Sequence, residues 1–285
     1  MKDFKFTSVD PRQLQQNLRR FPFFEDMVNR SLEVFLVSPL LNFSFNELFL
    51  NRISNEFTKH LQKEFKGVEG ALLLSSKPPR LPCVSVIVVD NVTPLFSARM
   101  MSFSSTTEGP HTRLPLMCRI INKKVSLGNS IVSFLEKRFC CAIKSCELTD
   151  MQFQWLMGIA INETLTRGLN DGITITHGMD GTQAAIHFTL EPESLEALWV
   201  ECLHCGSGGV NLDWNSVASF VLAVNDHFLN TFKWNNINMP VERVVVDGVS
   251  IARLKTLRLK VSNGGIIFVL LKFVDEIKET KMFCH

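Results

Sequence analysis

Residues 241–273 read VERVVVDGVSIARLKTLRLKVSNGGIIFVLLKF, a run of β-branched and aliphatic side chains that is interrupted by glycine-containing turns. Asp247-Gly248 and Asn263-Gly264 are dipeptides typical of tight hairpin turns. The pattern predicts three strands joined by these turns, at Val241–Val246, Ser250–Val261 and Ile266–Phe273. For the last segment a short helix is the alternative interpretation, because a continuous apolar run fits either a buried strand or a buried helix.

Upstream of this β-rich region the sequence alternates helical and strand signals. Ser44-Phe45-Asn46-Glu47 and Thr149-Asp150-Met151-Gln152 fit helix capping boxes, and Asp10-Pro11 predicts a short first helix. Further helices are expected at Asn129–Cys141, from Pro192 onward, and over Val217–Phe228. Strands are expected at Leu32–Val37, Ala71–Leu74, Val84–Val89, Leu95–Phe103, Leu114–Ile121, Ile173–Thr176 and Ala185–Leu190. The pattern predicts an α+β fold of mixed helices and mostly antiparallel sheet, with a β-rich C-terminal region.

The best candidate for a division of the chain is the polar segment Ser104–His111, which contains Gly109-Pro110. It predicts an N-terminal half over residues 1–105 and a C-terminal half over residues 112–285. One compact unit is the alternative, since 285 residues can also bury a single large core.

The composition narrows the class of protein. Lys and Arg total 30 and Asp and Glu total 28, so the formal charge is only +2 and any argument for a nucleic-acid partner depends on local patches. No cationic stretch followed by an apolar run opens the chain, so we expect no secretory signal and read the eight cysteines as reduced thiols. Tyrosine is absent, against 23 phenylalanines, which removes phenols as catalytic groups.

Motifs for catalysis or metal binding are scarce. The chain has no phosphate-binding loop, no dinucleotide fingerprint and no zinc-protease motif. Cys202-Leu203-His204-Cys205, with His187 as a third group, falls short of four zinc ligands, and packing of Cys202 in a helix is the preferred interpretation. We therefore predict no enzyme, no metal and no cofactor. A hydrolase or transferase that uses Cys140 or Cys205, with His177 or His187 as base, stays open as the alternative.

Two segments are locally basic. Residues 113–138 carry six basic side chains and one acidic, and residues 241–261 carry five basic and two acidic. Alternation along the predicted strand places Arg258 and Lys260 on the face opposite Leu257, Leu259 and Val261. A solvated strand face is one interpretation. The other is a strip of cations that contacts DNA phosphates, and the residues proposed for it are Arg243, Arg253, Lys255, Arg258 and Lys260.

The predicted C-terminal hairpin also suggests a surface for a protein partner, because an open edge presents unpaired N–H and C=O groups. The apolar residues proposed for this contact are Leu257, Leu259, Val261, Ile266, Phe268 and Leu270.

An ordered series of stretches resembles the centromere protein L family, subunits of the inner-kinetochore network. The first is Ser38–Leu48, where the family tends to carry tyrosines and this chain has Leu or Phe. The second is Phe134–Cys140, followed by a helix with Trp155. Ile186–Pro192, followed by Ala197-Leu198-Trp199, is the closest local match. His227-Phe228, Phe232-Lys233 and Arg243-Val244 follow at matching offsets, so that the series covers nearly the full chain.

The resemblance implies a mixed α/β fold without catalysis. It also implies a heterodimer with centromere protein N through the C-terminal β-rich region, a place in the nucleus at the centromere, and contact with centromeric nucleosomal or linker DNA. Arg243 falls where the family has an arginine, whereas Lys255, Arg258 and Lys260 match only as a generally basic strand. A scaffold without DNA contact is the remaining alternative.

Overall fold

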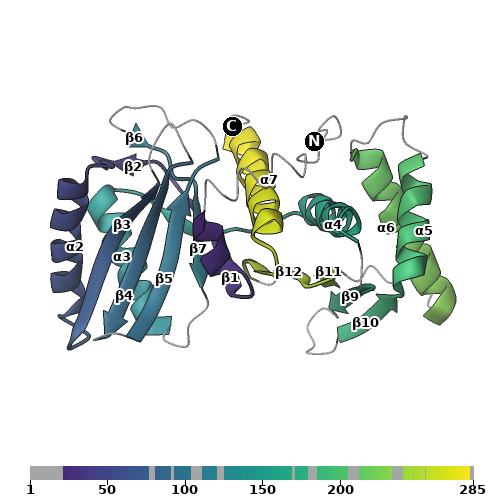
Figure 1. The fold of residues 1–285 in the computed structure, drawn as a ribbon, viewed down its shortest axis with the longest axis horizontal. Coiled ribbons are helices and arrows are strands. Elements are labelled where there is room, and N and C mark those ends of the chain that lie inside the picture. The colour runs from purple at the N-terminus through teal and green to yellow at the C-terminus, as the bar shows by residue number, and fades with distance from the viewer. Residues whose placement is uncertain are drawn as a thin grey trace. The chain divides into compact units, whose positions relative to one another are not determined.

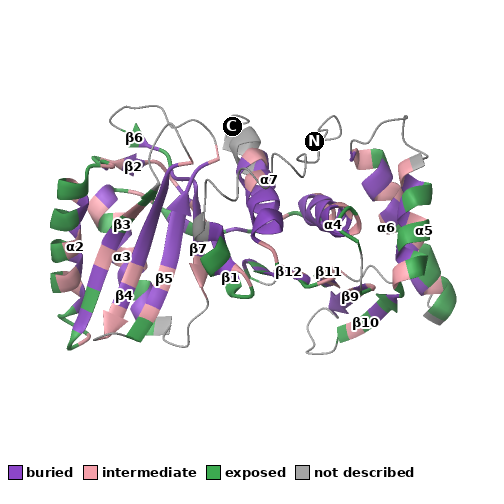
Figure 2. Ribbon diagram, viewed as in Figure 1, coloured by how far each residue is buried: buried purple, intermediate pink, exposed green. Residues whose placement is uncertain are grey.

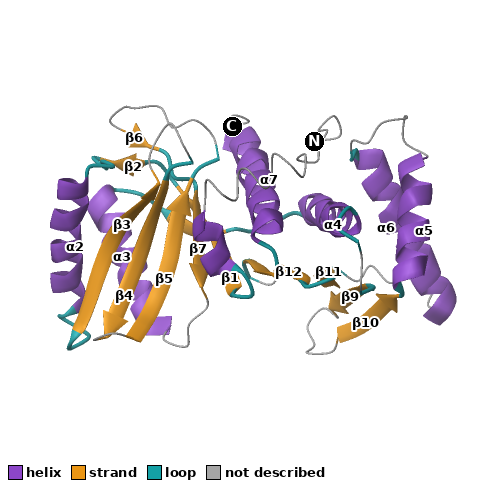
Figure 3. Ribbon diagram, viewed as in Figure 1, coloured by secondary structure: helices purple, strands orange, loops and turns teal. Residues whose placement is uncertain are grey.

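The structure is a computed structural model that describes residues 22–76, 81–90, 93–103, 111–120, 125–168, 171–178, 185–204, 212–232, 240–253 and 255–282. The fold is α+β, with helices and mostly antiparallel strands, as predicted (Figure 1; Figure 3). The helix predicted at Asp10-Pro11 lies outside the described residues.

The described chain divides into two compact units. The first, here called the N-terminal unit, contains residues 22–146, 255–257 and 274–282. The second, the C-terminal unit, contains residues 147–253 and 258–273. The division predicted at residues 106–111 differs from this one, because the strands on either side of that segment pair with each other inside the N-terminal unit, Met101 opposite Leu116.

The N-terminal unit is an antiparallel sheet with helices on one face. Its strands follow the order β1-β7-β5-β4-β3, and β8 pairs with the other side of β1. The elements are η1 (Pro22–Met27), β1 (Ser31–Val37), β2 (Leu40–Leu41), α2 (Glu47–Leu61), β3 (Val68–Ser76), β4 (Cys83–Asp90), β5 (Thr93–Met101), β6 (His111–Thr112), β7 (Leu116–Ile120), α3 (Val125–Phe139) and β8 (Ile143–Ser145).

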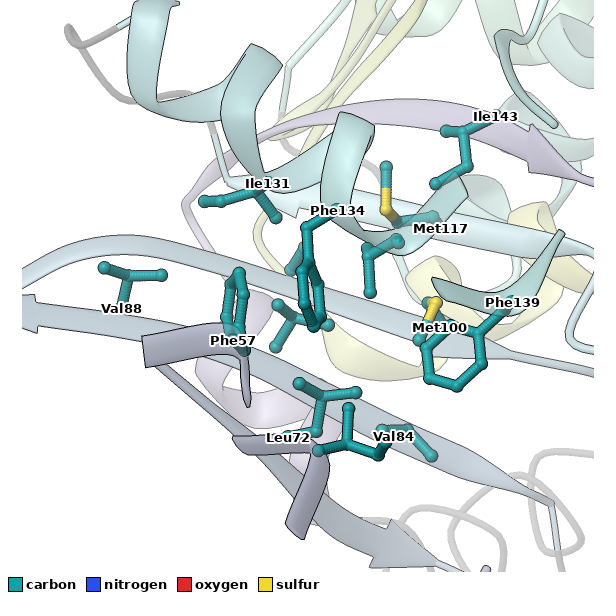
Figure 4. Packing of buried hydrophobic residues seen from close by; sticks show 14 of the residues in the cluster. Phe57, Leu72, Val84, Val88, Met100, Met117, Ile131, Phe134, Phe139 and Ile143 are labelled. Carbon is teal, nitrogen blue, oxygen red and sulfur yellow. The ribbon is translucent and has the colours of Figure 1, made fainter. Parts of the chain in front are cut away.

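The core of this unit lies between the sheet and helices α2 and α3 (Figure 4). Phe57 of α2 and Phe134 of α3 meet with ring centroids 4.9 Å apart. They cover alternate residues of the strands, such as Leu72 and Val84, which are 1% and 0% exposed. The face that α2 buries carries Leu50, Ile53, Phe57 and Leu61. Helix α2 begins two residues later than the predicted capping box, because the side chain of Asn46 accepts the N–H of Leu48.

The C-terminal unit is a second antiparallel arrangement, with strand order β10-β9-β11-β12-β13. The elements are α4 (Asp150–Leu165), β9 (Ile173–Gly178), β10 (Ala185–Leu190), α5 (Pro192–His204), α6 (Trp214–Phe232), β11 (Val241–Val246), β12 (Val249–Arg253), β13 (Leu257–Val261) and α7 (Gly264–Met282). The part of α7 up to Phe273 belongs to this unit. The part that begins at Val274 belongs to the N-terminal unit. The capping box predicted at Thr149 is confirmed, with both reciprocal hydrogen bonds present.

The predicted strand Ile266–Phe273 is wrong, and the segment is helical. The side chain of Asn263 accepts the N–H of Gly265 at 2.8 Å, and its carbonyl accepts the N–H of Ile267, so Asn263 caps α7 instead of opening a hairpin. The described side chains of α7 are buried on nearly all sides (Figure 2). A helix that is apolar all round is typical of a protein interior, and its sequence lacks the periodicity that would identify it.

Candidate nucleic-acid interface

The sheet of the C-terminal unit has one face toward helices and one toward solvent. Val244 and Val246 of β11 lie opposite Ile251 and Val249 of β12, and all four are at most 1% exposed. Helix α4 packs on these two strands. In Figure 1 the labelled helices of this unit lie on one side of the strands, and no helix of the described residues lies on the other. We call this second side the outer face.

The alternation predicted for the last strand is confirmed. Leu257, Leu259 and Val261 are buried, whereas Arg258 and Lys260 between them are exposed, so β13 contributes two cations to the outer face. Because the side-chain period of a strand is two residues, they stand about 7 Å apart.

Arg243 is the third cation of the outer face. It lies opposite Ala252 in the β11–β12 ladder and is exposed, on the side away from the buried Val244. Its Nε–H donates to Ser250 Oγ at 3.1 Å, and this hydrogen bond directs the guanidinium along the outer face toward β12. The outer face is therefore basic across β11 and β13.

The rest of the outer face carries hydroxyl groups together with the half-buried apolar residues Val245 and Ala252. Thr174 and Thr189 meet across β9 and β10 with hydroxyl oxygens 3.1 Å apart, and Thr176 Oγ1 lies 3.0 Å from His187 Nδ1. Sequence reasoning missed these groups. The alternation of Thr174 and Thr176 with the buried Ile173 and Ile175 is the signal that could have found them.

Acidic groups near the outer face are few. Glu242 is half-buried, and its carboxylate lies where a side chain on Gly178 would project, 2.1 Å from an ideal Cβ at that glycine. Asp247 sits in the β11–β12 turn. Within the described part of the outer face, the three cations therefore outnumber the carboxylates, and the exposed side chains include the imidazole of His187 but no Phe or Trp ring.

Arg253, predicted as a DNA contact, has a structural role on the helix side of the sheet. It forms an ion pair with Asp150 in the first turn of α4, and its Nε–H donates to the Val241 carbonyl at 2.8 Å. The guanidinium carbon lies 5.2 Å from the centre of the Phe153 ring. Strand alternation explains this placement, because Arg253 is in phase with the buried Val249 and Ile251. Arg253 is removed from the candidate interface.

Lys255 is exposed, but it lies between β12 and β13 in the short segment 255–257 that belongs to the N-terminal unit. The structure therefore gives no reason to group it with Arg243, Arg258 and Lys260.

The six apolar residues predicted to bind a partner lie inside the chain. Leu257, Leu259 and Val261 are at most 1% exposed on the inner face of β13, and Ile266, Phe268 and Leu270 are at most 8% exposed on α7. They form the protein's own core, because the segment they were assigned to is a buried helix and not an open hairpin. A partner contact through these side chains is a prediction that the structure contradicts.

The other basic segment, residues 113–138, is largely used for internal ion pairs. Arg119 pairs with Glu33, and Arg138 pairs with Glu56 at 2.9 Å. Arg113 and Lys137 are exposed, and Lys123 and Lys124 lie outside the described residues. This segment therefore offers fewer exposed cations than its composition indicates.

The thiols of the alternative hypothesis differ in environment. Burial raises the pKa of Cys83 to about 12 and that of Cys141 to about 11, and it raises the pKa of Cys118 further still. Cys202 is packed in α5, as predicted, and Cys140 is exposed at the end of α3. His177 is buried with its ring stacked on Phe228, 5.0 Å between centroids. Cys205 lies outside the described residues.

Comparison with known proteins adds no assignment. No family model matches the chain, and no curated protein matches it. Among the described residues, no helix combines the length and the apolar character that crossing a bilayer requires.

Proposed function

We propose that the chain is a non-enzymatic structural subunit of the inner kinetochore, related to centromere protein L, that pairs with centromere protein N and helps anchor the complex to centromeric nucleosomal or linker DNA. This function places the protein in the nucleus, at the centromere of the chromosome, during cell division. The support is the ordered series of resembling stretches and the basic outer face of the C-terminal unit.

The observation that carries the DNA contact is the placement of Arg243, Arg258 and Lys260 on one exposed sheet face. Cations that share a face can meet neighbouring phosphates of one backbone at the same time. A spacing of about 7 Å along β13 is close to that between successive phosphates on one strand. Hydroxyl groups such as Thr174 and Thr189 supply hydrogen-bond donors on the same face.

The chemistry of the outer face favours duplex DNA over single strands. Proteins that bind single-stranded nucleic acid stack bases on exposed aromatic rings. The described outer face presents no Phe or Trp ring and only the imidazole of His187, and its hydroxyls and cations suit phosphate and sugar oxygens, which carry no base identity. The proposed contact is therefore insensitive to sequence and strongly sensitive to salt.

Pairing with centromere protein N must use surfaces other than the six buried apolar residues. Strand β10 offers one such surface, since it pairs only with β9 among the described strands and its outward side chains Ala185, His187 and Thr189 are exposed. An edge strand of this kind can accept a strand from a partner.

The test is the affinity of the heterodimer for a duplex of about 30 base pairs across a salt series, with the double variant Arg258→Glu/Lys260→Glu. If both side chains contact phosphates, the slope of log affinity against log salt flattens by about 1.8, which is about 0.9 for each lost contact. Lys59→Glu/Lys63→Glu, at the end of α2 and just after it, is the matched control, because both lysines are exposed in the N-terminal unit.

The variant Arg258→Glu/Lys260→Glu could fold and pair normally and still match wild type in affinity and salt slope. The protein would then be a scaffold that makes no DNA contact at this face. A preference for single-stranded over duplex DNA would contradict the assignment to a duplex backbone.

A further inference from the structure

The charges of the chain are distributed very unevenly along its length. Residues 168–232 contain no lysine and no arginine. They contain eight acidic residues, which are Asp171, Asp180, Glu191, Glu193, Glu196, Glu201, Asp213 and Asp226. The formal charge of this segment is −8 and the whole chain carries +2, so the rest of the chain is strongly basic. Such separation is hidden by the near-neutral total.

In the structure four of these acids lie on the helices α5 and α6, which are Glu193, Glu196 and Glu201 on α5 and Asp226 on α6. The two helices pack together through Trp199 and Phe220, whose ring centroids lie 5.0 Å apart. Helix α6 also covers the inner side of the sheet, where Phe228 contacts the ring of Phe188. The pair thus lies on the side of the sheet opposite the basic outer face.

The outward side of α5 is acidic with an apolar centre. Glu193, Glu196 and Glu201 are exposed, and so is Val200, at 41%. Val200 follows Glu196 by four residues, so the two side chains are neighbours on the helix surface. Figure 2 shows the exposed side of α5 directed outward.

Helix α6 repeats the combination. Leu222 is 63% exposed, and the exposed Asp226 follows it by one helical turn. Among the described residues only four large apolar side chains are prominently exposed, and two of them lie on this helix pair, each with a carboxylate one turn away.

Of the four acidic side chains, Glu193 alone lies in the first turn of its helix, where the helix dipole favours an anion. Glu193 and Glu196 are three residues apart, where like charges repel. Glu201 lies near the C-terminus of α5, where the helix dipole disfavours an anion. None of Glu193, Glu196, Glu201 and Asp226 takes part in the ion pairs formed by the described residues.

We propose that the outward side of α5 and α6, formed by Glu193, Glu196, Val200, Glu201, Leu222 and Asp226, docks a basic amphipathic helix of a partner protein. Apolar side chains of the partner cover Val200 and Leu222, and its lysines and arginines neutralise the surrounding carboxylates. Complementary charge selects this class of partner and excludes an acidic one, because like charges across an interface are costly. This surface is separate from the proposed DNA contact and does not depend on it.

The probe is a fluorescein-labelled helical peptide of about 18 residues, with leucines on one face and lysines on the other. Its binding to the full chain is measured by fluorescence anisotropy at two salt concentrations. Two control peptides are used. One keeps the leucine pattern and has glutamate in place of lysine. The other has the composition of the probe in an order that gives no apolar face. We expect binding of the first peptide alone, weakened by salt.

The variants separate the two parts of the surface. Glu196→Lys/Glu201→Lys should weaken binding about tenfold, since two exposed interactions change sign. Leu222→Ser should weaken it by a few fold through lost apolar contact. Glu196→Gln/Glu201→Gln is a milder substitute if the reversed pair fails to fold. The matched controls are Glu64→Lys/Glu69→Lys and Leu48→Ser in the N-terminal unit, where the side chains are equally exposed.

Equal binding of the glutamate peptide, or equal loss in the variants and their matched controls, would overturn the proposal. Concentration-dependent self-association that Leu222→Ser abolishes would overturn it in favour of a second copy of this chain. Arg258→Glu/Lys260→Glu should leave peptide affinity unchanged or raised, so failure here and failure of the DNA contact are distinguishable.

Discussion

Arg119 shows how a single side chain can be held from several directions. It forms an ion pair with Glu33, the residue directly opposite it across β1 and β7. Its guanidinium carbon lies 4.9 Å from the centre of the Phe35 ring. Gly128 of α3 leaves the space that the guanidinium occupies, since a Cβ there would come within 2.8 Å of Nη1. The Glu33 side chain is only 7% exposed, so water compensates little of its charge.

We expect Arg119→Leu to lower the free energy of unfolding by about 3 kcal/mol, because the buried Glu33 loses the cation with which it pairs. The double variant Glu33→Leu/Arg119→Leu should recover much of the loss, because the pair is replaced by apolar groups. Denaturant unfolding measures both. Arg52→Leu is the control, since Arg52 is 65% exposed and faces Glu56 at 4.0 Å. A loss in Arg119→Leu no larger than in this control would show that Glu33 is solvated.

Residue-level prediction succeeded where one periodicity applied without interruption. Arg258 and Lys260 were placed correctly because Leu257, Leu259 and Val261 fix the phase of β13. The same phase puts Arg253 on the buried side, so its assignment to the DNA contact came from composition alone. The three exposed cations of the candidate interface could therefore be found from sequence, whereas the ion pair of Arg253 with Asp150 joins elements that no local pattern relates.

At the scale of elements, the two glycine-containing dipeptides had different outcomes. Asp247-Gly248 is the predicted hairpin turn between β11 and β12, with φ of 38° and 74° at the two residues. Both central residues of a two-residue turn of this type need positive φ. Asn263-Gly264 instead begins a helix, because asparagine is favoured both in such turns and as a helix cap. Local sequence leaves these two outcomes open, and tertiary packing of α7 selects one.

Gly248→Ala should lower the free energy of unfolding by more than about 1 kcal/mol. Alanine is strained at the positive φ of this residue, and its Cβ would lie 2.5 Å from Ser262 Oγ. Gly168→Ala is the matched variant, since its φ is +84° and nothing lies within 4 Å of the added carbon. Thermal or denaturant unfolding of the two variants separates the steric part from the backbone part. Equal losses would show that Ser262 moves aside without cost.

At the scale of the whole molecule, the two units are not formed by two halves of the sequence. The N-terminal unit includes residues 274–282, and Val274, Asp275 and Ile277 are at most 3% exposed. The Asp275 carboxylate accepts the N–H of Phe103 at 2.8 Å. Gly109-Pro110 is a boundary signal, but composition cannot reveal that Asp275, 172 residues after Phe103, belongs to the same unit.

A chain that ends after Phe273 should therefore have a destabilised N-terminal unit. We expect faster amide hydrogen exchange in residues 93–103, which lose the contact with Asp275, and a lower melting temperature for the unit. Asp275→Ala tests the carboxylate alone and should produce a smaller change in the same direction. Unchanged exchange in 93–103 after truncation would show that the unit is complete without the end of α7.

The return of the chain to the N-terminal unit has a consequence during synthesis. Residues 147–273, which separate the first and last parts of that unit, number 127. At a ribosomal rate of about 5–20 residues per second, about 6–25 seconds pass between the emergence of residue 146 and that of Val274. Over that interval the nascent N-terminal sheet lacks the buried side chains that complete it. Because of this order of synthesis, we expect the nascent N-terminal unit to bind chaperones until the last turns of α7 have been synthesised.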